Sequence, residues 1–174
     1  MPRIARTVAP DYPHHVTQRG NYQQPVFDEE DDFCQYLKWL QEYSKKYALK
    51  IWAYCLMTNH VHFVCIPEQE DSLARTPFEI LTIFQSKKKL KSHLWQGRFY
   101  SCTLDEKHLY AAVRYVETNP VRSGIVRKPQ RYKWSSGRSH INMEENFVLS
   151  QDCYLVKEIE DWLEYLREKR MSKS

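Results

Sequence analysis

Glycine, paired cysteine motifs and long apolar runs are all scarce in this chain of 174 residues. Only four glycines occur and no segment repeats at a fixed period, which argues against solenoids and flexible multidomain chains. The five cysteines form no Cys-x-x-Cys pair, so we expect reduced thiols and no zinc ribbon. No run of 18 apolar residues is present, and the basic start MPRIAR continues into polar sequence. We therefore expect a cytoplasmic protein with no membrane anchor.

Positive charge is concentrated in one part of the chain. The net charge is only +4, but residues 84–140 hold thirteen basic residues against three acidic ones. A block of one sign favours a polyanion as the partner. Lysines on a solvated helix face would give the same count, so charge alone leaves this alternative open.

The hydrophobic pattern predicts an α+β fold. In chain order we expect a strand at 12–20, a helix at 28–48, strands at 49–57 and 60–66, a helix at 78–90 and a strand at 97–104. This order is typical of the ferredoxin-like plan, an antiparallel sheet with helices packed on one face. A third helix at 105–119, stopped by Pro120, and an amphipathic helix at 149–170 follow. We expect one domain over 1–140 and an acidic C-terminal helical extension over 141–174.

The stretch MTNHVHFV, residues 57–64, contains two histidines in a strand-like context. Alternate side chains of a strand point to the same face, so His60 and His62 should lie together with their Cα atoms about 7 Å apart. Two such imidazoles can bind one metal ion. Same-face histidines can also be a half-buried polar pair without a ligand.

The helix predicted at 105–119 carries two further candidates. Its apolar stripe should face the core, while a neighbouring sector holds Tyr115 and, one turn later, Asn119. If this sector lies over the sheet face with the two histidines, a phenol and three neutral ligands meet in one place. Core packing for Tyr115 and helix termination by Asn119 are the alternatives.

Four motifs in order carry a family resemblance. PHHVTQRGN (13–21), MTNHVHFV (57–64), HLWQGRFYSC (93–102) and RYVETNPVRSGIV (114–126) together resemble the REP-associated tyrosine transposases. These are a branch of the single-tyrosine transposases with the histidine, hydrophobic, histidine motif of HUH endonucleases. The similarity extends over about residues 1–140.

The resemblance implies a DNA endonuclease and strand transferase. Tyr115 would be the nucleophile and form a covalent 5′-phosphotyrosine, while His60, His62 and Asn119 would hold Mg²⁺ or Mn²⁺. The substrate would be single-stranded DNA with a hairpin from bacterial intergenic repeats, which places the protein at the nucleoid. A hydrolytic metal nuclease, in which Tyr115 only packs, and a non-catalytic single-stranded nucleic-acid-binding module are the alternatives.

Basic side chains interleaved with aromatic ones suit binding to a single strand. The expected DNA contacts are Arg3, Arg6, Arg19, Lys87, Lys88, Lys89, Lys91, Arg98, Arg122, Arg127, Lys128, Arg131 and Lys133. Relatives encoded by insertion sequences exchange tyrosine helices between two subunits. Here the C-terminal helix would cover the pairing surface, so we expect a monomer in which Tyr115 acts in its own chain, with a dimer as the alternative.

Overall fold

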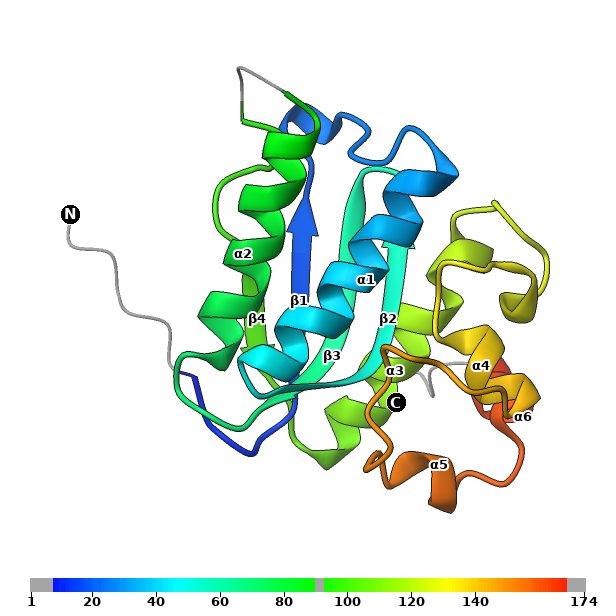
Figure 1. The fold of residues 1–174 in the computed structure, drawn as a ribbon. Helices are drawn as coiled ribbons and strands as arrows, with labels where there is room; N and C mark the ends of the chain where they lie inside the picture. Colours follow the sequence, from blue (N-terminus) through cyan, green and yellow to red (C-terminus); the bar gives the residue numbers. More distant parts are fainter. Residues whose placement is uncertain (1–7, 90–92, 169–174) are drawn as a thin grey trace.

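A computed structural model of the protein describes residues 8–89 and 93–168 (Figure 1). Within these ranges the strands are β1 (His14–Arg19), β2 (Leu49–Met57), β3 (His60–Pro67) and β4 (Tyr100–Thr103). The α-helices are α1 (Glu30–Lys46), α2 (Ser72–Lys87), α3 (Glu106–Arg122), α4 (Gly137–Asn142), α5 (Leu155–Glu158) and α6 (Trp162–Arg167). Two 3₁₀ turns, η1 (Asn21–Gln23) and η2 (Pro129–Arg131), lie in the connections.

The strands form one antiparallel sheet in the order β2-β3-β1-β4. β2 and β3 make a hairpin through Thr58 and Asn59, with Met57 opposite His60. The long connections through α1 and α2 place β1 beside β3 and β4 beside β1. The strand order and the helix positions confirm the predicted α+β, ferredoxin-like plan.

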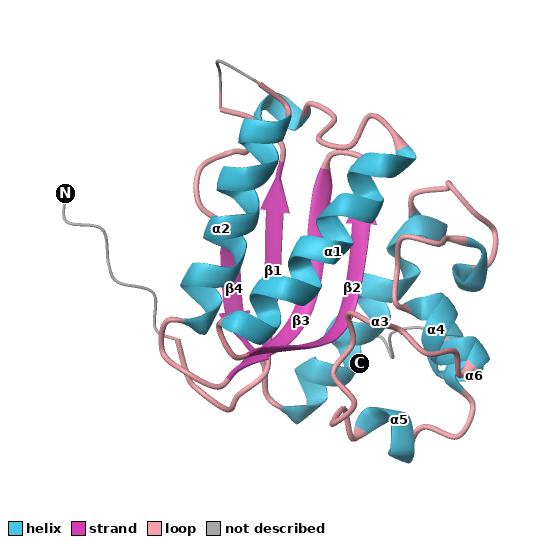
Figure 2. Cartoon of the chain, in the orientation of Figure 1, coloured by secondary structure: helices cyan, strands magenta, loops and turns pink. Residues whose placement is uncertain are grey.

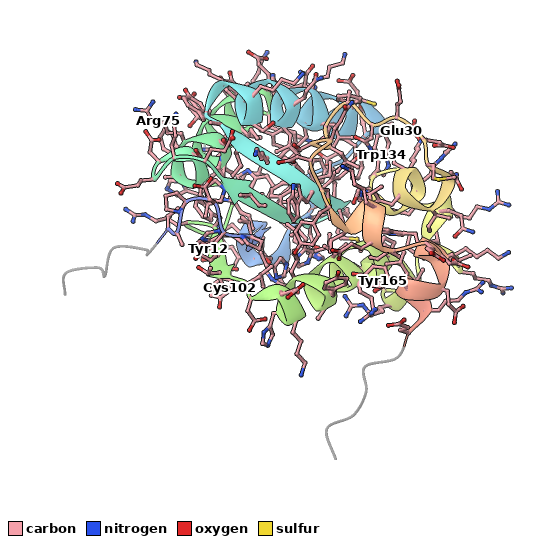
Figure 3. The ribbon with its side chains drawn as sticks, turned by 90° about the horizontal axis from the view of Figure 1, so that it is seen from below. Tyr12, Glu30, Arg75, Cys102, Trp134 and Tyr165 are labelled. Carbon is pink, nitrogen blue, oxygen red and sulfur yellow. The ribbon has the colours of Figure 1, made fainter. Side chains whose placement is uncertain are left out.

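Helices cover both faces of the sheet. α1 and α2 lie in front of the strands (Figure 2), and the view from below shows α1 and α3 on opposite sides of the sheet (Figure 3). β2 and β3 are buried at almost every position because side chains on both of their faces meet a helix layer. The front core contains Tyr36 and Phe84, and the rear core contains Leu109 and Val113.

The ends of α1 agree with the local signals in its sequence. Glu29 and Asp32 form a capping box, and Lys45 and Lys46 lie in the last turn. Acidic groups at the beginning and basic groups at the end both complement the helix dipole. The predicted helix at 28–48 is thereby confirmed with slightly shorter bounds.

The start of α2 differs from the prediction. The helix begins at Ser72 instead of Phe78 and contains Pro77 in its interior. Leu73, Ile80 and Phe84 are all buried, so one apolar stripe continues through the proline. Packing of this stripe against the sheet offsets the backbone hydrogen bond that Pro77 cannot donate.

The end of α3 also differs, because the helix passes through Pro120 and ends at Arg122. A proline in the last turn removes only its own bond to the carbonyl of Val116. Beyond it the chain turns back, since the carbonyl of Pro120 accepts hydrogen bonds from the backbone N–H of Ile125 and Val126, at 3.0 and 3.4 Å. The buried proline thus belongs to the helix and does not stop it.

The C-terminal region is not the single helix predicted at 149–170. It contains the short helices α5 and α6, separated by an extended segment in which Asp161 caps α6 by accepting a hydrogen bond from the N–H of Glu164 at 2.9 Å. The polar residues around Asp161 favour this break over a continuous helix. Leu155 and Trp162 are buried, as the predicted stripe requires.

A further helix, α4, forms between the two helices predicted at 105–119 and 149–170. The domain boundary expected at residue 140 falls inside it and remains a prediction. All five cysteines lie in the described residues as free thiols. Among the described residues, no helix combines the length and apolarity needed to cross a bilayer.

Candidate active site

The two histidines of the HVH motif lie side by side on β3. The ring centroids of His60 and His62 are 5.0 Å apart, with their planes at 87°. β3 is an inner strand between β2 and β1, so its position is fixed by backbone hydrogen bonds on both sides. The predicted pairing of these imidazoles on one face is confirmed.

α3 brings Tyr115 to the same place. Its ring centroid is 5.5 Å from that of His62, with the planes nearly perpendicular. Leu109, Val113 and Val116 are buried on the core side of α3, whereas Tyr115 keeps 36% of its surface exposed. The phenol is therefore open to a large substrate while its ring contacts His62.

His15 and Thr17 on β1 complete the cluster, and neither is among the candidates predicted from the sequence. Nδ1 of His62 lies 3.1 Å from both Nε2 of His15 and Oγ1 of Thr17. The rings of His15 and His62 stack with centroids 5.3 Å apart, and His15 is 5.9 Å from the ring of Tyr115. Alternation in PHHVTQ places His15 and Thr17 on one strand face, but only the register of β1 against β3 brings that face to His62.

The environment favours neutral imidazoles. Burial, together with the charge of Arg19, lowers the pKa of His60 to about 4. Burial, followed by its histidine and arginine neighbours, lowers the pKa of His62 to about 2. Both rings are thus uncharged at neutral pH, which is the form that binds a metal ion.

One atom in particular fits a metal ligand. Nε2 of His62 is buried and has no hydrogen-bond partner among the described residues, while Nδ1 of the same ring is held by His15 and Thr17. A metal-binding histidine characteristically has its second nitrogen fixed in this way. On the neighbouring ring, Nδ1 of His60 lies 2.7 Å from Oδ1 of Asn59, so Nε2 is the nitrogen that this contact leaves for a ligand.

Asn119 lies one turn beyond Tyr115 and is buried, with 6% of its surface exposed. Its Oδ1 accepts a hydrogen bond from the hydroxyl of Ser123 at 3.2 Å and keeps a second lone pair. Over residues 8–89 and 93–168 no group of three or more His, Cys, Asp or Glu side chains is arranged to hold a metal ion. Asn119, one turn after Tyr115 on α3, stays the predicted third ligand.

Arg122 covers Tyr115 from the end of α3. Its guanidinium carbon lies 3.8 Å from the centroid of the Tyr115 ring, and one of its amino groups donates to the carbonyl oxygen of Tyr115 at 3.1 Å. Arg19, opposite His60 in the sheet, adds a second exposed cation beside the cluster. The site thus joins an exposed phenol, neutral imidazoles and cations that suit a phosphate group.

Comparison with known proteins places this geometry in a family. Residues 9–119 match the model of the family described as Transposase IS200 like, a span that contains every member of the cluster up to Asn119. The chain belongs to the IS200-like transposase family. The resemblance expected from the four sequence motifs is confirmed.

Two relatives are similar to this IS200-like transposase. A protein of Haemophilus influenzae, assigned by name to the REP-associated tyrosine transposases, is 26% identical over 56% of this chain and 64% of its own length. The chain thus spans slightly less than two thirds of that relative. The solved structure of a REP-associated tyrosine transposase bound to a REP hairpin has a TM-score of 0.70 and 20% identity, covering 87% of this chain and 93% of the other. At this identity the likeness shows the shared fold.

The acidic first turn of α1 binds three of the basic residues that were expected to contact DNA. Lys87 pairs with Asp31 at 2.8 Å, and Lys133 pairs with Glu30. Lys88 is only 14% exposed at its side chain and contacts Asp28 and Asp32, at 2.6 and 2.5 Å. The structure therefore gives Lys88 an internal role in joining α2 to α1, and its charge is not free for a phosphate.

The other predicted DNA contacts fall into separate regions of the transposase. Lys89, Arg127, Lys128 and Arg131 are exposed, the last three in the connection after α3. Arg98 lines a cavity of about 980 Å³ beside α2, together with Arg75 and Trp95, instead of the Tyr115 cluster. Arg3, Arg6 and Lys91 lie outside the described residues.

Proposed function

We propose that this transposase cleaves single-stranded DNA next to a hairpin and rejoins it through a covalent phosphotyrosine at Tyr115. The observation that carries the proposal is the contact between the exposed Tyr115 ring and His62, whose buried Nε2 meets no hydrogen-bonding group in the part of the chain that the structure describes. A nucleophile and an open coordination position thus lie side by side. Membership of the transposase family supports the same chemistry.

Tyr115 would attack the scissile phosphorus through its hydroxyl oxygen. The new bond joins Tyr115 to the 5′ phosphate, the bond from phosphorus to the 3′ oxygen breaks, and the phenol proton passes to the leaving oxygen. One phosphodiester replaces another, so a 3′ hydroxyl can reverse the step without ATP. A free phenol ionises near pH ~10, which means that its attack needs assistance at neutral pH.

The residues around Tyr115 supply that assistance. His60, His62 and Asn119 would hold Mg²⁺ or Mn²⁺, whose charge would polarise the scissile phosphate and stabilise its added negative charge. Nδ1 of His62 lies within hydrogen-bond distance of His15 and Thr17. With a metal ion on Nε2, Nδ1 would carry the ring's proton and donate it to one of these two groups, which keeps Nε2 directed at the site.

Arg122 has two functions in the proposed site. Its stack on the Tyr115 ring restricts the ring's rotation, and its charge lies close to the position that the phosphate must take. Arg19 adds a second positive charge near His60. Both cations would draw the strand toward the phenol.

The proposed substrate is a DNA hairpin with a single-stranded flank. A structurally similar REP-associated transposase was solved with a REP hairpin, and this chain presents an exposed basic segment after α3. Arg19, Lys89, Arg98, Arg122, Arg127, Lys128 and Arg131 are the described residues that we assign to the DNA backbone. We propose a monomer as the active form, since α6 packs against α3 in the same chain.

A denaturing gel tests the function directly. Hairpin DNA labelled on the 3′ side of the cleavage point, incubated with protein and Mn²⁺, should migrate with the protein after denaturation. Tyr115→Phe should abolish this adduct and leave hairpin binding within about twofold, since only the hydroxyl is removed. Cleaved DNA without an adduct would instead indicate a hydrolase, and intact DNA that is merely bound would indicate a binding module.

A further inference from the structure

Glu117 is a completely buried carboxylate on the helix that carries the nucleophile. It lies two residues after Tyr115 and two before Asn119. Two residues correspond to about 200° around an α-helix, so Glu117 points away from the site that Tyr115 faces. A carboxylate buried in this way is stable only when its oxygens are fully hydrogen-bonded.

Three side chains from outside the sheet satisfy this carboxylate. Oε1 accepts hydrogen bonds from the hydroxyl of Ser136 at 2.6 Å and from Nδ1 of His140 at 2.5 Å. Oε2 accepts a hydrogen bond from the indole N–H of Trp162 at 2.7 Å. The rings of His140 and Trp162 also pack together, with centroids 4.3 Å apart.

The same network extends to the sheet, and the backbone of α4 packs closely against Glu117. The hydroxyl of Ser136 accepts a hydrogen bond from the backbone N–H of Tyr54 on β2 at 2.9 Å. A Cβ added at Gly137 would lie 3.3 Å from the Cβ of Glu117, so a larger residue would press on α3. One carboxylate thus fixes α3 against β2, α4 and α6.

The donors to Glu117 all lie beyond the family match. That match ends at Asn119, whereas Ser136, His140 and Trp162 come from the C-terminal part of the chain. The C-terminal part therefore contributes polar contacts to the tyrosine helix as well as covering its apolar surface. Hydrogen bonds fix the rotation and height of a helix more narrowly than apolar contacts, because they are directional.

We propose that Glu117, held by Ser136, His140 and Trp162, is a positioning residue that sets the rotation of α3 and thereby the place of Tyr115 against His62. This inference rests on the proposed function, since it assigns the network a role in the alignment of the nucleophile. A nucleophile misplaced by about 1 Å can lose roughly 100-fold in rate.

Trp162→Phe tests the inference with little change in packing, because it removes one hydrogen bond to Glu117 and keeps an aromatic ring. Trp52→Phe is the matched control: its indole N–H donates to Asp152 at 3.1 Å, also a buried tryptophan bonded to a carboxylate, but not on α3. The measurements are the rate of adduct formation at saturating hairpin DNA, the Kd for that DNA, and the thermal midpoint.

The expected result for Trp162→Phe is a rate lowered about tenfold with Kd within twofold, while Trp52→Phe keeps the wild-type rate at a similar thermal midpoint. Amide hydrogen exchange of the peptide around Tyr115 should become faster in Trp162→Phe alone. A wild-type rate in Trp162→Phe would overturn the inference. An equal fall in rate in Trp162→Phe and Trp52→Phe would overturn it as well. A wild-type protein without any adduct would overturn the proposed function first, and hydrogen exchange would still report whether the network anchors α3.

Discussion

The guanidinium of Arg122 stacks on the ring of Tyr115, with its central carbon 3.8 Å from the ring centroid. The two residues are seven positions apart, two turns of α3, so the arginine reaches back along the helix to the phenol. The same arginine donates to the carbonyl oxygen of Tyr115. A single side chain thus orients the proposed nucleophile and places a cation at the site.

Arg122→Lys should separate these two contributions. The lysine keeps the charge but cannot stack flat on the ring, and an exposed cation–π contact is worth roughly 0.5–1 kcal/mol. We expect adduct formation to slow by about threefold in Arg122→Lys and by tenfold or more in Arg122→Gln, as measured in single-turnover gels. A wild-type rate in Arg122→Lys would mean that stacking does not contribute, and equal slowing in the two variants would mean that the charge does not.

Manganese binding should depend on the histidines to different extents. Loss of His62 as a ligand should abolish binding in His62→Ala, whereas His15→Ala should weaken it by about 10- to 100-fold, because His15 only orients His62. Titration calorimetry without DNA measures both effects. His108→Ala is the control, since His108 is exposed and pairs with Asp105. An unchanged affinity in His62→Ala would place the metal elsewhere.

Lys88 and Arg127 should respond differently in DNA binding. Arg127→Met should weaken hairpin binding and reduce the slope of log Kd against log salt by about 0.7–0.9, the contribution of one phosphate contact. Lys88→Met should leave this slope unchanged and lower the thermal midpoint, because Lys88 pairs with Asp28 and Asp32. A reduced salt slope in Lys88→Met would contradict the internal role.

Acid should destabilise the junction of α1 and α2. Burial alone would raise the pKa of Asp32, but hydrogen bonds from Lys88 and from the backbone N–H groups of Asp28 and Glu29 outweigh it and lower the pKa below 3.8. A carboxylate with a lowered pKa stabilises the fold above about pH 4, and this contribution disappears as the pH falls through the folded-state pKa.

Asp32→Asn should therefore lower the free energy of unfolding at pH 6. Between pH 4 and pH 2.5, the free energy of unfolding should fall less in Asp32→Asn than in the wild type. Urea unfolding at a series of pH values measures both quantities. Asp161→Asn is a suitable control, because asparagine preserves the cap of α6. An identical pH dependence in Asp32→Asn and wild type would exclude the assigned ionic role.

Much of the candidate site could be predicted because it depends on local periodicity. His60 and His62 share a face since a strand alternates, and Tyr115 faces away from Leu109 and Val113 since a helix repeats every 3.6 residues. The apolar stripe of α3 also contains a charged residue, a signal that could have predicted the buried network. Glu117 is four residues after Val113, and a charge on a buried stripe indicates a buried network.

The errors arose where distant contacts outweigh local preference. A proline usually ends a helix, but Pro120 is buried in the last turn of α3 and the helix continues to Arg122. The predicted helix at 149–170 follows a real apolar stripe, yet Asp161 starts a new helix where the chain turns against α3. Propensity is a weak term, and a few buried side chains are enough to exceed it.

The amino-acid sequence by itself determined the order of the four strands and of α1 to α3, the pairing of the two imidazoles and the face of α3 that carries Tyr115, because each depends on residues only a few positions apart. The tertiary structure alone decided that β1 places His15 beside His62, that Lys88 pairs with the start of α1, and that Glu117 meets Trp162. These contacts join residues 45 or more positions apart. Their formation depends on strand register and helix packing, which no local pattern encodes.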